Sequence, residues 1–278
     1  MGQRHRRPAL VTQALTSSRA RSLARPFLSF ALGAAGLFVA SSAEALNVDR
    51  LEPPEQTLLQ STLQHLEPVI TAKKPDGTAN ILTWDALRDP LTEEERAFLG
   101  RFRALKAEAL GSTSHHFGEA DASDLEPVGP QQAFKDGAPA PLDPQFLPRP
   151  VREAYEAMMQ AMRRDLGKTL LVESGYRSPA YQLYLFLFYL PKHGYSIRET
   201  NRFVALPGYS EHGNPERQAI DFINEDGVNG EDHPEQFEAL PEYRWLQQHA
   251  KAFGFFLSYP RDNAYHTSFE PWHWHYER

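Results

Sequence analysis

The sequence contains no cysteine among its 278 residues. Disulfide bonds and lipidation of an N-terminal cysteine are therefore excluded, so the chain needs no oxidising compartment and is safe in one. Any metal site has to be built from histidine, aspartate or glutamate. The sequence offers 11 histidines and 36 acidic residues for that purpose.

The sequence is also short of long apolar runs. The run at 27–40 (FLSFALGAAGLFVA) has 14 residues, whereas a membrane-spanning helix needs about 20. An arginine-rich leader precedes this run, and the small residues Ala43 and Ala45 follow it. This order is typical of a secretory signal peptide, here residues 1–45 with cleavage after Ala45. The alternative is an uncleaved membrane anchor. Twin-arginine export through Arg6-Arg7 fits the surrounding residues poorly.

Positive charge is scarce once the leader is removed. Residues 1–45 contain six arginines and one acid, which leaves 23 basic and 35 acidic residues and a formal charge of −12. An acidic chain of this kind argues against nucleic acid or an anionic membrane as a partner. After cleavage of the leader we expect no stable membrane insertion.

Three regions follow the leader. Residues 46–110 carry apolar residues at helical spacing and predict a helical N-terminal region. Residues 111–147 are rich in glycine, serine, aspartate and proline, with three prolines in the seven residues 138–144, and predict a linker or a long surface loop. Residues 148–278 mix helical and strand patterns without a regular βαβ alternation. That mixture favours an α+β domain with a small, mostly antiparallel sheet flanked by helices.

Polar residues that suit a metal centre occur in this last region. His212 follows a Pro-Gly-Tyr-Ser turn, and Asp221 lies in the apolar run after it. A histidine on a loop and an aspartate on the next strand can converge on one ion, and two histidines with one carboxylate form a known catalytic zinc set. Taken singly, a surface histidine and a turn aspartate are the plainer interpretation.

The end of the chain supplies two further histidines. Trp272, Trp274 and Tyr276 alternate with His273, His275 and Glu277, so a strand here has an aromatic face and a face with both histidines. The spacing does not choose between His273 and His275 as a ligand.

Two charged residues near these segments suit catalysis. Pro271 predicts an irregular start of the last strand, so that Glu270 can turn toward a metal and move protons. Arg177 directly follows a short buried strand, and its guanidinium can hold a substrate carboxylate or a developing oxyanion. A solvated loop acid and a structural salt bridge are the respective alternatives.

Five ordered motifs carry a resemblance to a known family. They are Ser-Gly-Tyr-Arg-Ser-x-x-x-Gln at 174–182, Pro-Gly-x-Ser-Glu-His at 207–212, Ala-x-Asp at 219–221, Gly-Phe-x-Leu-x-Tyr-Pro at 254–260 and Glu-Pro-Trp-His-Trp at 270–274. Together they resemble the VanY-type D-alanyl-D-alanine carboxypeptidases, which belong with lysostaphin-type peptidases and the hedgehog domain to one wider zinc-peptidase group. The resemblance covers about residues 146–278.

The resemblance implies roles for individual residues. His212, Asp221 and His273 correspond to the ligands of one zinc ion, Glu270 to the general base and Arg177 to the arginine that stabilises the scissile carbonyl oxygen. The positions expected to bind substrate are Tyr176, Gln182 and Ser210. His275 is then a neighbour of the ligands. One departure is the spacing between His212 and Asp221, where eight residues intervene and the family usually has six, so an extra bulge is expected at 214–217.

The resemblance also implies a function. We expect a zinc-dependent D,D-carboxypeptidase of the periplasm or cell envelope that removes the C-terminal D-alanine from peptidoglycan stem peptides. An L,D-carboxypeptidase, a peptidoglycan endopeptidase with the same zinc site and a non-catalytic zinc or peptidoglycan-binding module are the alternatives. Glu270 together with Arg177 favours an enzyme, because a binding module has no need of both.

Overall fold

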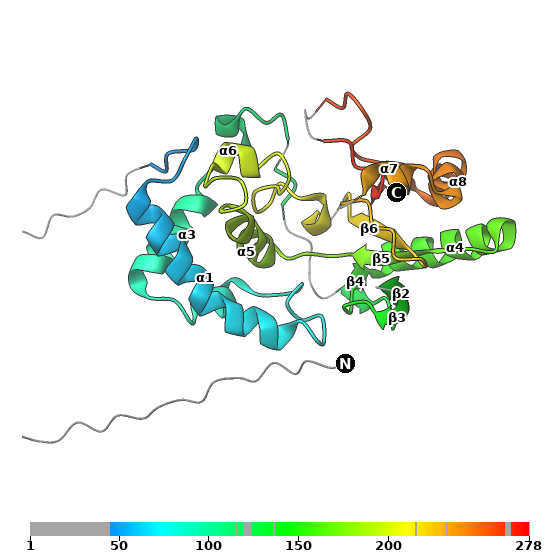
Figure 1. The fold of residues 1–278 in the computed structure, drawn as a ribbon, viewed down its shortest axis with the longest axis horizontal. Coiled ribbons are helices and arrows are strands. Elements are labelled where there is room, and N and C mark those ends of the chain that lie inside the picture. Colours follow the sequence, from blue (N-terminus) through cyan, green and yellow to red (C-terminus); the bar gives the residue numbers. More distant parts are fainter. Residues whose placement is uncertain are drawn as a thin grey trace, which may run out of the picture. The chain divides into compact units, whose positions relative to one another are not determined.

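The computed structural model describes residues 45–114, 116–118, 124–135, 137–214, 216–231, 233–264 and 268–277 (Figure 1). Apart from Ala45, the expected signal peptide lies outside these residues. Within the described part of the chain, no helix is both long and apolar enough to cross a membrane.

Helices make up most of the regular structure. The α-helices are α1 (Pro53–Lys73), α2 (Trp84–Arg88), α3 (Glu93–Arg103), α4 (Arg149–Leu166), α5 (Pro179–Tyr189), α6 (Ile197–Thr200), α7 (Pro234–Glu238) and α8 (Pro241–His249). Short 3-10 helices among the described residues are η1 (Ala107–Leu110), η3 (Glu211–Gly213) and η4 (Ala250–Phe253).

One antiparallel sheet positions the candidate site. Its strands are β5 (Leu170–Ser174), β6 (Ala219–Asn224), β7 (Phe255–Leu257) and β8 (His273–Tyr276), in the order β5-β6-β8-β7. Asp221 on β6 is the register partner of Ser174 on β5 and of His273 on β8. Directly opposite residues of neighbouring strands point to the same face of a sheet. The pairing therefore brings a carboxylate and an imidazole together.

The sheet has its own hydrophobic core, to which α4 and α8 contribute. In α4, Val151, Tyr155, Met158 and Met162 are buried at helical spacing, which gives the helix one apolar face. The hydroxyl of Tyr155 donates to the carbonyl of Leu170 on β5 at 2.9 Å. These contacts dock α4 on the sheet, and the predicted α+β class with a small antiparallel sheet is confirmed.

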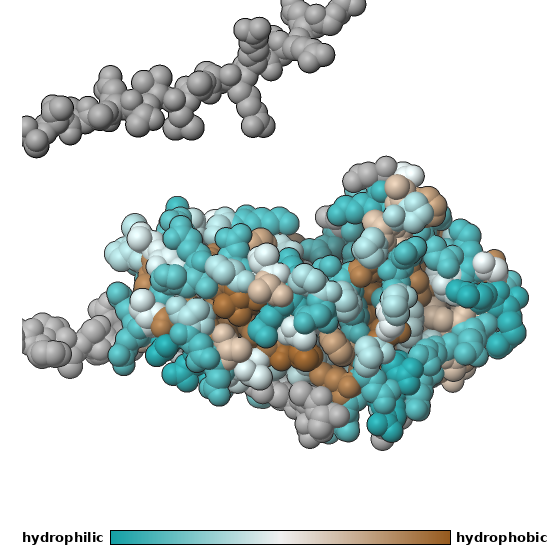
Figure 2. All heavy atoms as spheres, turned by 90° about the horizontal axis from the view of Figure 1, so that it is seen from below, coloured by the Kyte–Doolittle hydropathy of each residue, from teal (hydrophilic) through white to brown (hydrophobic). Residues whose placement is uncertain are grey.

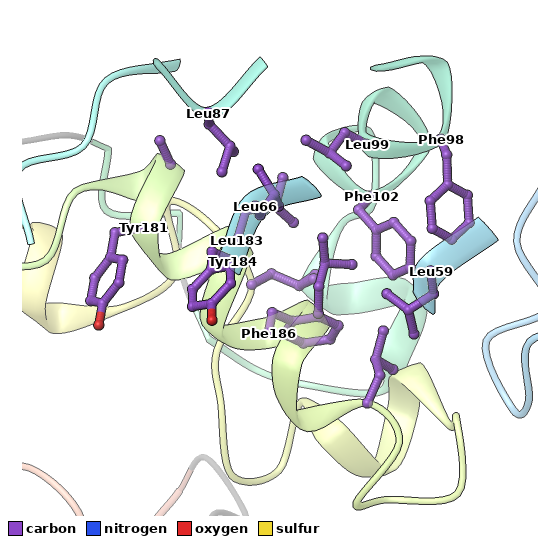
Figure 3. Close-up of a cluster of buried hydrophobic side chains, with 14 of the residues drawn as sticks. Leu59, Leu66, Leu87, Phe98, Leu99, Phe102, Tyr181, Leu183, Tyr184 and Phe186 are labelled. Carbon is purple, nitrogen blue, oxygen red and sulfur yellow. The ribbon is translucent and has the colours of Figure 1, made fainter. Parts of the chain in front are cut away.

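A second core joins the N-terminal helices to α5. The sequence of α5, PAYQLYLFLFY, is apolar on nearly every side, as expected of a helix that is covered all round. Figure 3 shows Phe186 of α5 among side chains of α1 and α3, with Phe102 next to it. The ring centroids of Phe102 and Phe186 are 6.2 Å apart. Residues 46–110 are therefore packed against residues 148–278 through this helix.

The segment at 111–147 differs from the expected linker or loop, because it contains regular structure. It holds β1 (Leu125–Pro127), β2 (Gln132–Lys135) and β3 (Ala138–Pro141), and β4 (Phe146–Pro148) begins at its end. β1 pairs with β4 and β2 with β3. Strands of three or four residues carry too little periodic pattern to be read from sequence, and the prolines at 139 and 141 hide one of them.

The surface of the protein is mainly hydrophilic on one face (Figure 2). On the face that Figure 2 shows, hydrophilic side chains dominate, and apolar side chains are visible in patches between them. Among the described residues, Phe134, Phe188 and Phe203 are large apolar side chains that are about half exposed.

Candidate metal centre

His212, Asp221 and His273 form one cluster. Their candidate ligand atoms all lie within 4.8 Å of one another. Nε2 of His212 is 3.0 Å from Oδ2 of Asp221, and Nδ1 of His273 is 2.8 Å from Oδ1 of the same carboxylate. The side chains come from η3, β6 and β8, so the sheet register and the loop before β6 together build the cluster.

The hydrogen bonding of His212 shows that the cluster fits a cation. Its Nδ1 lies 2.7 Å from the carbonyl oxygen of Gly175, and a carbonyl can only accept, so Nδ1 carries the proton. Burial, together with the charge of Arg177, lowers the pKa of His212 to about 4, and the ring is neutral at pH 7. Its buried Nε2 has no hydrogen-bond partner among the described residues. A nitrogen lone pair therefore faces a carboxylate oxygen, and a cation bound by both atoms would relieve their repulsion.

His273 lies between two carboxylates. Its Nε2 is 2.9 Å from Oε2 of Glu211, and its Nδ1 faces Asp221. Burial alone would lower the pKa of His273, but Asp221 and Glu211 raise it to about 10. Without a metal, a proton on Nδ1 supplies the positive charge that the site requires. A metal ion would take its place, bound by Nε2 of His212, the Asp221 carboxylate and Nδ1 of His273, a set of donors that suits zinc.

Glu211 is a residue whose role the sequence did not reveal. It lies in the motif directly before His212, and neither its residue type nor its spacing indicates a role. In the structure its side chain is buried, and its Oε1 accepts from Arg217 at 3.2 Å while Oε2 holds His273. Burial favours the neutral acid, but His273 outweighs it and lowers the pKa of Glu211 to about 2. A carboxylate that binds the second nitrogen of a ligand histidine fixes the tautomer and the ring orientation.

Glu270 and Arg177 approach the cluster from two sides. Oε2 of Glu270 lies 3.9 Å from Nδ1 of His273, and Nη2 of Arg177 lies 3.8 Å from Oδ2 of Asp221. Burial raises the pKa of Glu270 to about 7, close to the value that proton transfer at neutral pH favours. The turn at Pro271 and Trp272 precedes β8. The expected irregular strand start is therefore present, and it turns Glu270 toward the cluster.

A cavity of about 780 Å³ opens onto these groups. Its lining includes Arg177, Glu270 and the three clustered side chains, and also Gln182 and Ser210. Gln182 donates from Nε2 to the carbonyl of Ala205 at 2.8 Å, while its Oε1 has no partner among the described residues. The Ser210 hydroxyl accepts from the backbone N–H of His212, so it also caps η3.

Tyr176 lies differently from the expected substrate contact. It is only 3% exposed, and it is absent from the described residues that line the cavity. It follows Gly175 in the turn after β5, where its backbone is hydrogen-bonded to Phe146. The structure therefore places its side chain inside the protein and away from the cavity wall.

The register of β8 distinguishes the two terminal histidines. His273 is paired with Asp221, whereas His275 is paired with Ala219, two residues or nearly 7 Å further along β6. His275 instead lies 2.7 Å from the Ser258 hydroxyl and 3.0 Å from Arg217. His273 is therefore the histidine of the metal cluster.

The longer spacing between His212 and Asp221 leaves the cluster intact. Asn214 accepts from the backbone N–H of Glu216 at 2.8 Å, which closes a tight turn in the loop before β6. Pro215 lies outside the described residues. Asp221 keeps a partner on both neighbouring strands, Ser174 on β5 and His273 on β8, although the register of β5 shifts between Val172 and Ser174.

Comparison with known proteins agrees with this geometry. Residues 145–278 match the family model for VanY, D-alanyl-D-alanine carboxypeptidase. The chain is 30% identical over 133 residues to the putative carboxypeptidase YodJ of Bacillus subtilis, which covers 47% of this chain and 46% of that protein. It is 30% identical over 139 residues to the bifunctional D-Ala-D-Ala dipeptidase and carboxypeptidase VanXYC of Enterococcus gallinarum, covering 47% of this chain and 67% of that protein.

A solved structure with a similar fold is that of the LD-carboxypeptidase LdcB. The likeness has a TM-score of 0.43 at 26% identity and covers 56% of this chain and 69% of that one. The chain thus spans less than half of the Bacillus relative and two thirds of the Enterococcus one. On the strength of the shared sequence, the chain belongs to the VanY-type D-alanyl-D-alanine carboxypeptidase family.

Proposed function

We propose that this protein is a zinc-dependent D,D-carboxypeptidase that removes the C-terminal D-alanine from peptidoglycan stem peptides. One observation carries the proposal. A buried lone pair of His212 faces the Asp221 carboxylate at 3.0 Å, and the neighbouring Glu270 borders the same cavity. Two relatives, one from Bacillus subtilis and one from Enterococcus gallinarum, are a putative carboxypeptidase and a D-Ala-D-Ala dipeptidase and carboxypeptidase.

The zinc would be held by Nε2 of His212, the carboxylate of Asp221 and Nδ1 of His273. When bound in such a site, zinc supplies Lewis-acid chemistry: it polarises carbonyl groups and makes water more acidic. Glu211 keeps the lone pair of His273 on Nδ1, because its carboxylate accepts a hydrogen bond from Nε2–H of the ring. The chain thereby presents one nitrogen from each histidine to the ion.

Glu270 moves the proton. As a carboxylate it accepts a proton from the attacking water on Oε2, the oxygen that faces His273. It then donates this proton to the amine of the leaving D-alanine, so that the carboxylate is regenerated at the end of the cycle.

The positively charged side chain of Arg177 is placed to bind a negatively charged group of the substrate at the same site. It lies at the cavity wall within 4 Å of Asp221, and its buried Nε has no hydrogen-bond partner among the described residues. A free guanidinium edge of this kind can pair with the oxyanion that forms on the scissile carbonyl, or with the substrate's terminal carboxylate. Gln182 lines the same cavity, and its amide oxygen, which has no hydrogen-bond partner among the described residues, can accept from a peptide N–H of the substrate.

The test uses the purified chain from Leu46 with three substrates. We expect about one zinc per chain and release of free D-alanine from a stem pentapeptide, followed by mass spectrometry. Cleavage of only the tetrapeptide would indicate an L,D-carboxypeptidase, and cleavage of cross-linked muropeptides an endopeptidase. Binding of zinc and peptide without any cleavage would replace the proposal by a binding module.

We also propose that the protein acts in the periplasm or cell envelope. The support is the arginine-rich leader, the apolar run at 27–40 and the small residues before Leu46. N-terminal sequencing of the protein from a fractionated bacterial host should show Leu46 as the first residue, in the envelope fraction. A chain that keeps Met1 and stays in the cytoplasm would contradict this localisation.

A further inference from the structure

The turn at 175–178 connects β5 to α5 and serves the candidate metal centre twice. The carbonyl oxygen of Gly175 accepts from Nδ1 of His212 at 2.7 Å, which decides that Nε2 keeps its lone pair. Two residues later the turn carries Arg177, whose backbone N–H donates to the carbonyl of His212 at 3.0 Å. Any rotation of this turn would move the arginine and release the histidine together.

Residues before β5 hold the turn in place. Gly175 donates its N–H to Oε1 of Gln145 at 3.0 Å, and Tyr176 donates its N–H to the carbonyl of Phe146 at 2.8 Å. Ser178 donates its N–H to the carbonyl of Asn80 at 2.8 Å and its hydroxyl to the carbonyl of Leu82 at 2.7 Å.

The peptide unit between Gly175 and Tyr176 is held at both ends. Its N–H is bound by Phe146 and its carbonyl by His212, and a peptide unit is planar, so both bonds fix one orientation. A Cβ on Gly175 would come within 2.6 Å of the Phe146 carbonyl oxygen. The close approach of the 145–146 segment therefore requires glycine at this position.

Asn80, which is partly buried, and Gln145, which is buried, are hydrogen-bonded to each other beside the turn, and both line the cavity. Nδ2 of Asn80 donates to Oε1 of Gln145 at 3.0 Å, and Nε2 of Gln145 donates to the carbonyl of Asp143 at 3.3 Å. The amide oxygen thus receives two donors, Asn80 and Gly175, and Gln145 is only 5% exposed. Asn80 lies well outside the part of the chain that matches the family model.

We propose that Asn80 and Gln145 are positioning residues of the metal centre. They fix the Gly175 turn, and through it the tautomer of His212 and the position of Arg177. As far as the ion is concerned, this inference rests on the proposed function. The region at 46–145 is then a working part of the centre, because its side chains set the geometry of a ligand that they do not touch.

The test compares variants of the whole chain from Leu46. Gln145→Met removes the acceptor for Gly175 while keeping the side-chain length, and Asn80→Ala removes the donor that orients Gln145. Gln131→Met is the matched control. Gln131 forms two hydrogen bonds, at 2.8 and 2.9 Å, to the backbone of Val172 on β5, the strand that leads into the turn. No hydrogen bond joins Gln131 to the turn itself among the described residues. Gln145→Glu keeps the acceptor and serves as the conservative variant.

Two readouts other than activity decide the matter. We expect Gln145→Met to weaken zinc binding, measured by competition with a chelator, by roughly 10–100-fold, the range for changes behind a metal ligand. Amide hydrogen exchange of residues 175–178 in the zinc-free protein should be faster in Gln145→Met and Asn80→Ala than in the parent. Gln131→Met should change neither zinc affinity nor exchange at the turn. Gln145→Glu should retain most of the zinc affinity of the parent protein.

The inference is overturned if Gln145→Met and Gln131→Met have equal effects, or if exchange at the turn is unchanged. Should Gln145→Met fail to fold, Asn80→Ala should still weaken zinc binding, whereas Gln145→Glu should keep most of it. A parent protein that binds zinc but cleaves no stem peptide would refute the proposed function and leave this inference standing. If the parent protein binds no zinc, the hydrogen-exchange data alone decide whether Asn80 and Gln145 hold the turn in place.

Discussion

Glu270 is the side chain on which the proposed turnover depends most directly. Glu270→Gln keeps the size of the side chain but cannot accept a proton at neutral pH. Because the three metal ligands are untouched, we expect normal folding and unchanged zinc content. General acid–base groups contribute about 10²–10⁴-fold to a rate, and the loss should lie near the upper end. Steady-state release of D-alanine measures this, with zinc analysis as the control. A variant as fast as the parent would remove Glu270 from the mechanism.

The two histidines of β8 should behave differently, since only His273 faces Asp221. His273→Ala should lose the metal and all activity. His275→Ala should keep the metal, with a loss of activity nearer the 10–100-fold range, because His275 contacts Ser258 and Arg217 instead. Metal content by elemental analysis distinguishes the two. If His275→Ala lost the metal and His273→Ala kept it, the strand register would have to be redrawn.

Glu211 acts on the metal only through His273. Glu211→Gln removes the negative charge that binds Nε2 of His273 and Arg217, and an amide that presents its NH₂ group to the ring would favour the wrong tautomer. We expect zinc affinity to fall by roughly 10–100-fold while the protein remains folded. A chelator competition assay checks this. Equal affinity in Glu211→Gln and the parent would show that the tautomer of His273 is set elsewhere.

At the scale of elements, Glu95 joins α3 to α1. Its carboxylate accepts from the Ser61 hydroxyl at 2.6 Å and from the backbone N–H of Thr92 at 2.9 Å, and it contacts His65. Burial opposes the ionised form, but these hydrogen bonds outweigh it and lower the pKa of Glu95 below its usual 4.5. A lowered pKa contributes stability that is present above the unfolded-state pKa and lost as the pH falls through the folded-state value.

The expected outcome follows from that sign. Glu95→Gln should lower the free energy of unfolding by about 1–3 kcal/mol at pH 7, because the buried hydrogen-bond network loses the negative charge and one of its two acceptor oxygens. The difference from the parent should shrink as the pH falls below 4.5. Urea denaturation of both proteins at several pH values measures it. A difference that is the same at pH 7 and at low pH would exclude the ionised carboxylate as the cause.

At the scale of the whole molecule, the N-terminal helices and the peptidase region depend on each other. Leu183, Phe186 and Leu187 of α5 are fully buried in the core that includes α1 and α3 (Figure 3). Removing residues 46–145 would expose this face and remove the acceptors of two N–H groups of the turn, those of Gly175 and Ser178. We expect residues 146–278 alone to aggregate or to lack a fixed tertiary structure.

Near-UV circular dichroism and size-exclusion chromatography of residues 146–278 and of the chain from Leu46 test this expectation. The longer chain is the control, and it should show a sharp, cooperative unfolding transition. A shorter chain that is monomeric, cooperatively folded and active would show that the N-terminal region is dispensable.

Much of the fold was determined by local sequence. The apolar residues at helical spacing in 46–110 lie mainly in α1 and α3. Long periodic segments are predictable because their pattern repeats over several turns. The ordered motifs likewise identified the family, since they bring together residue types that suit a single chemistry.

Only the tertiary structure decided the rest. Spacing on β8 could not separate His273 from His275, because both lie on one face, and the pairing with β6 made the choice. The burial of Tyr176, the short strands between 125 and 148, and the contact of Glu211 with His273 depend on partners far away in the chain. The hydrogen bonds that join Asn80 to Gln145 and Gln145 to Gly175 also connect residues that are far apart in the sequence. A residue's type limits what it can bind, but long-range packing and strand register determine which groups it meets.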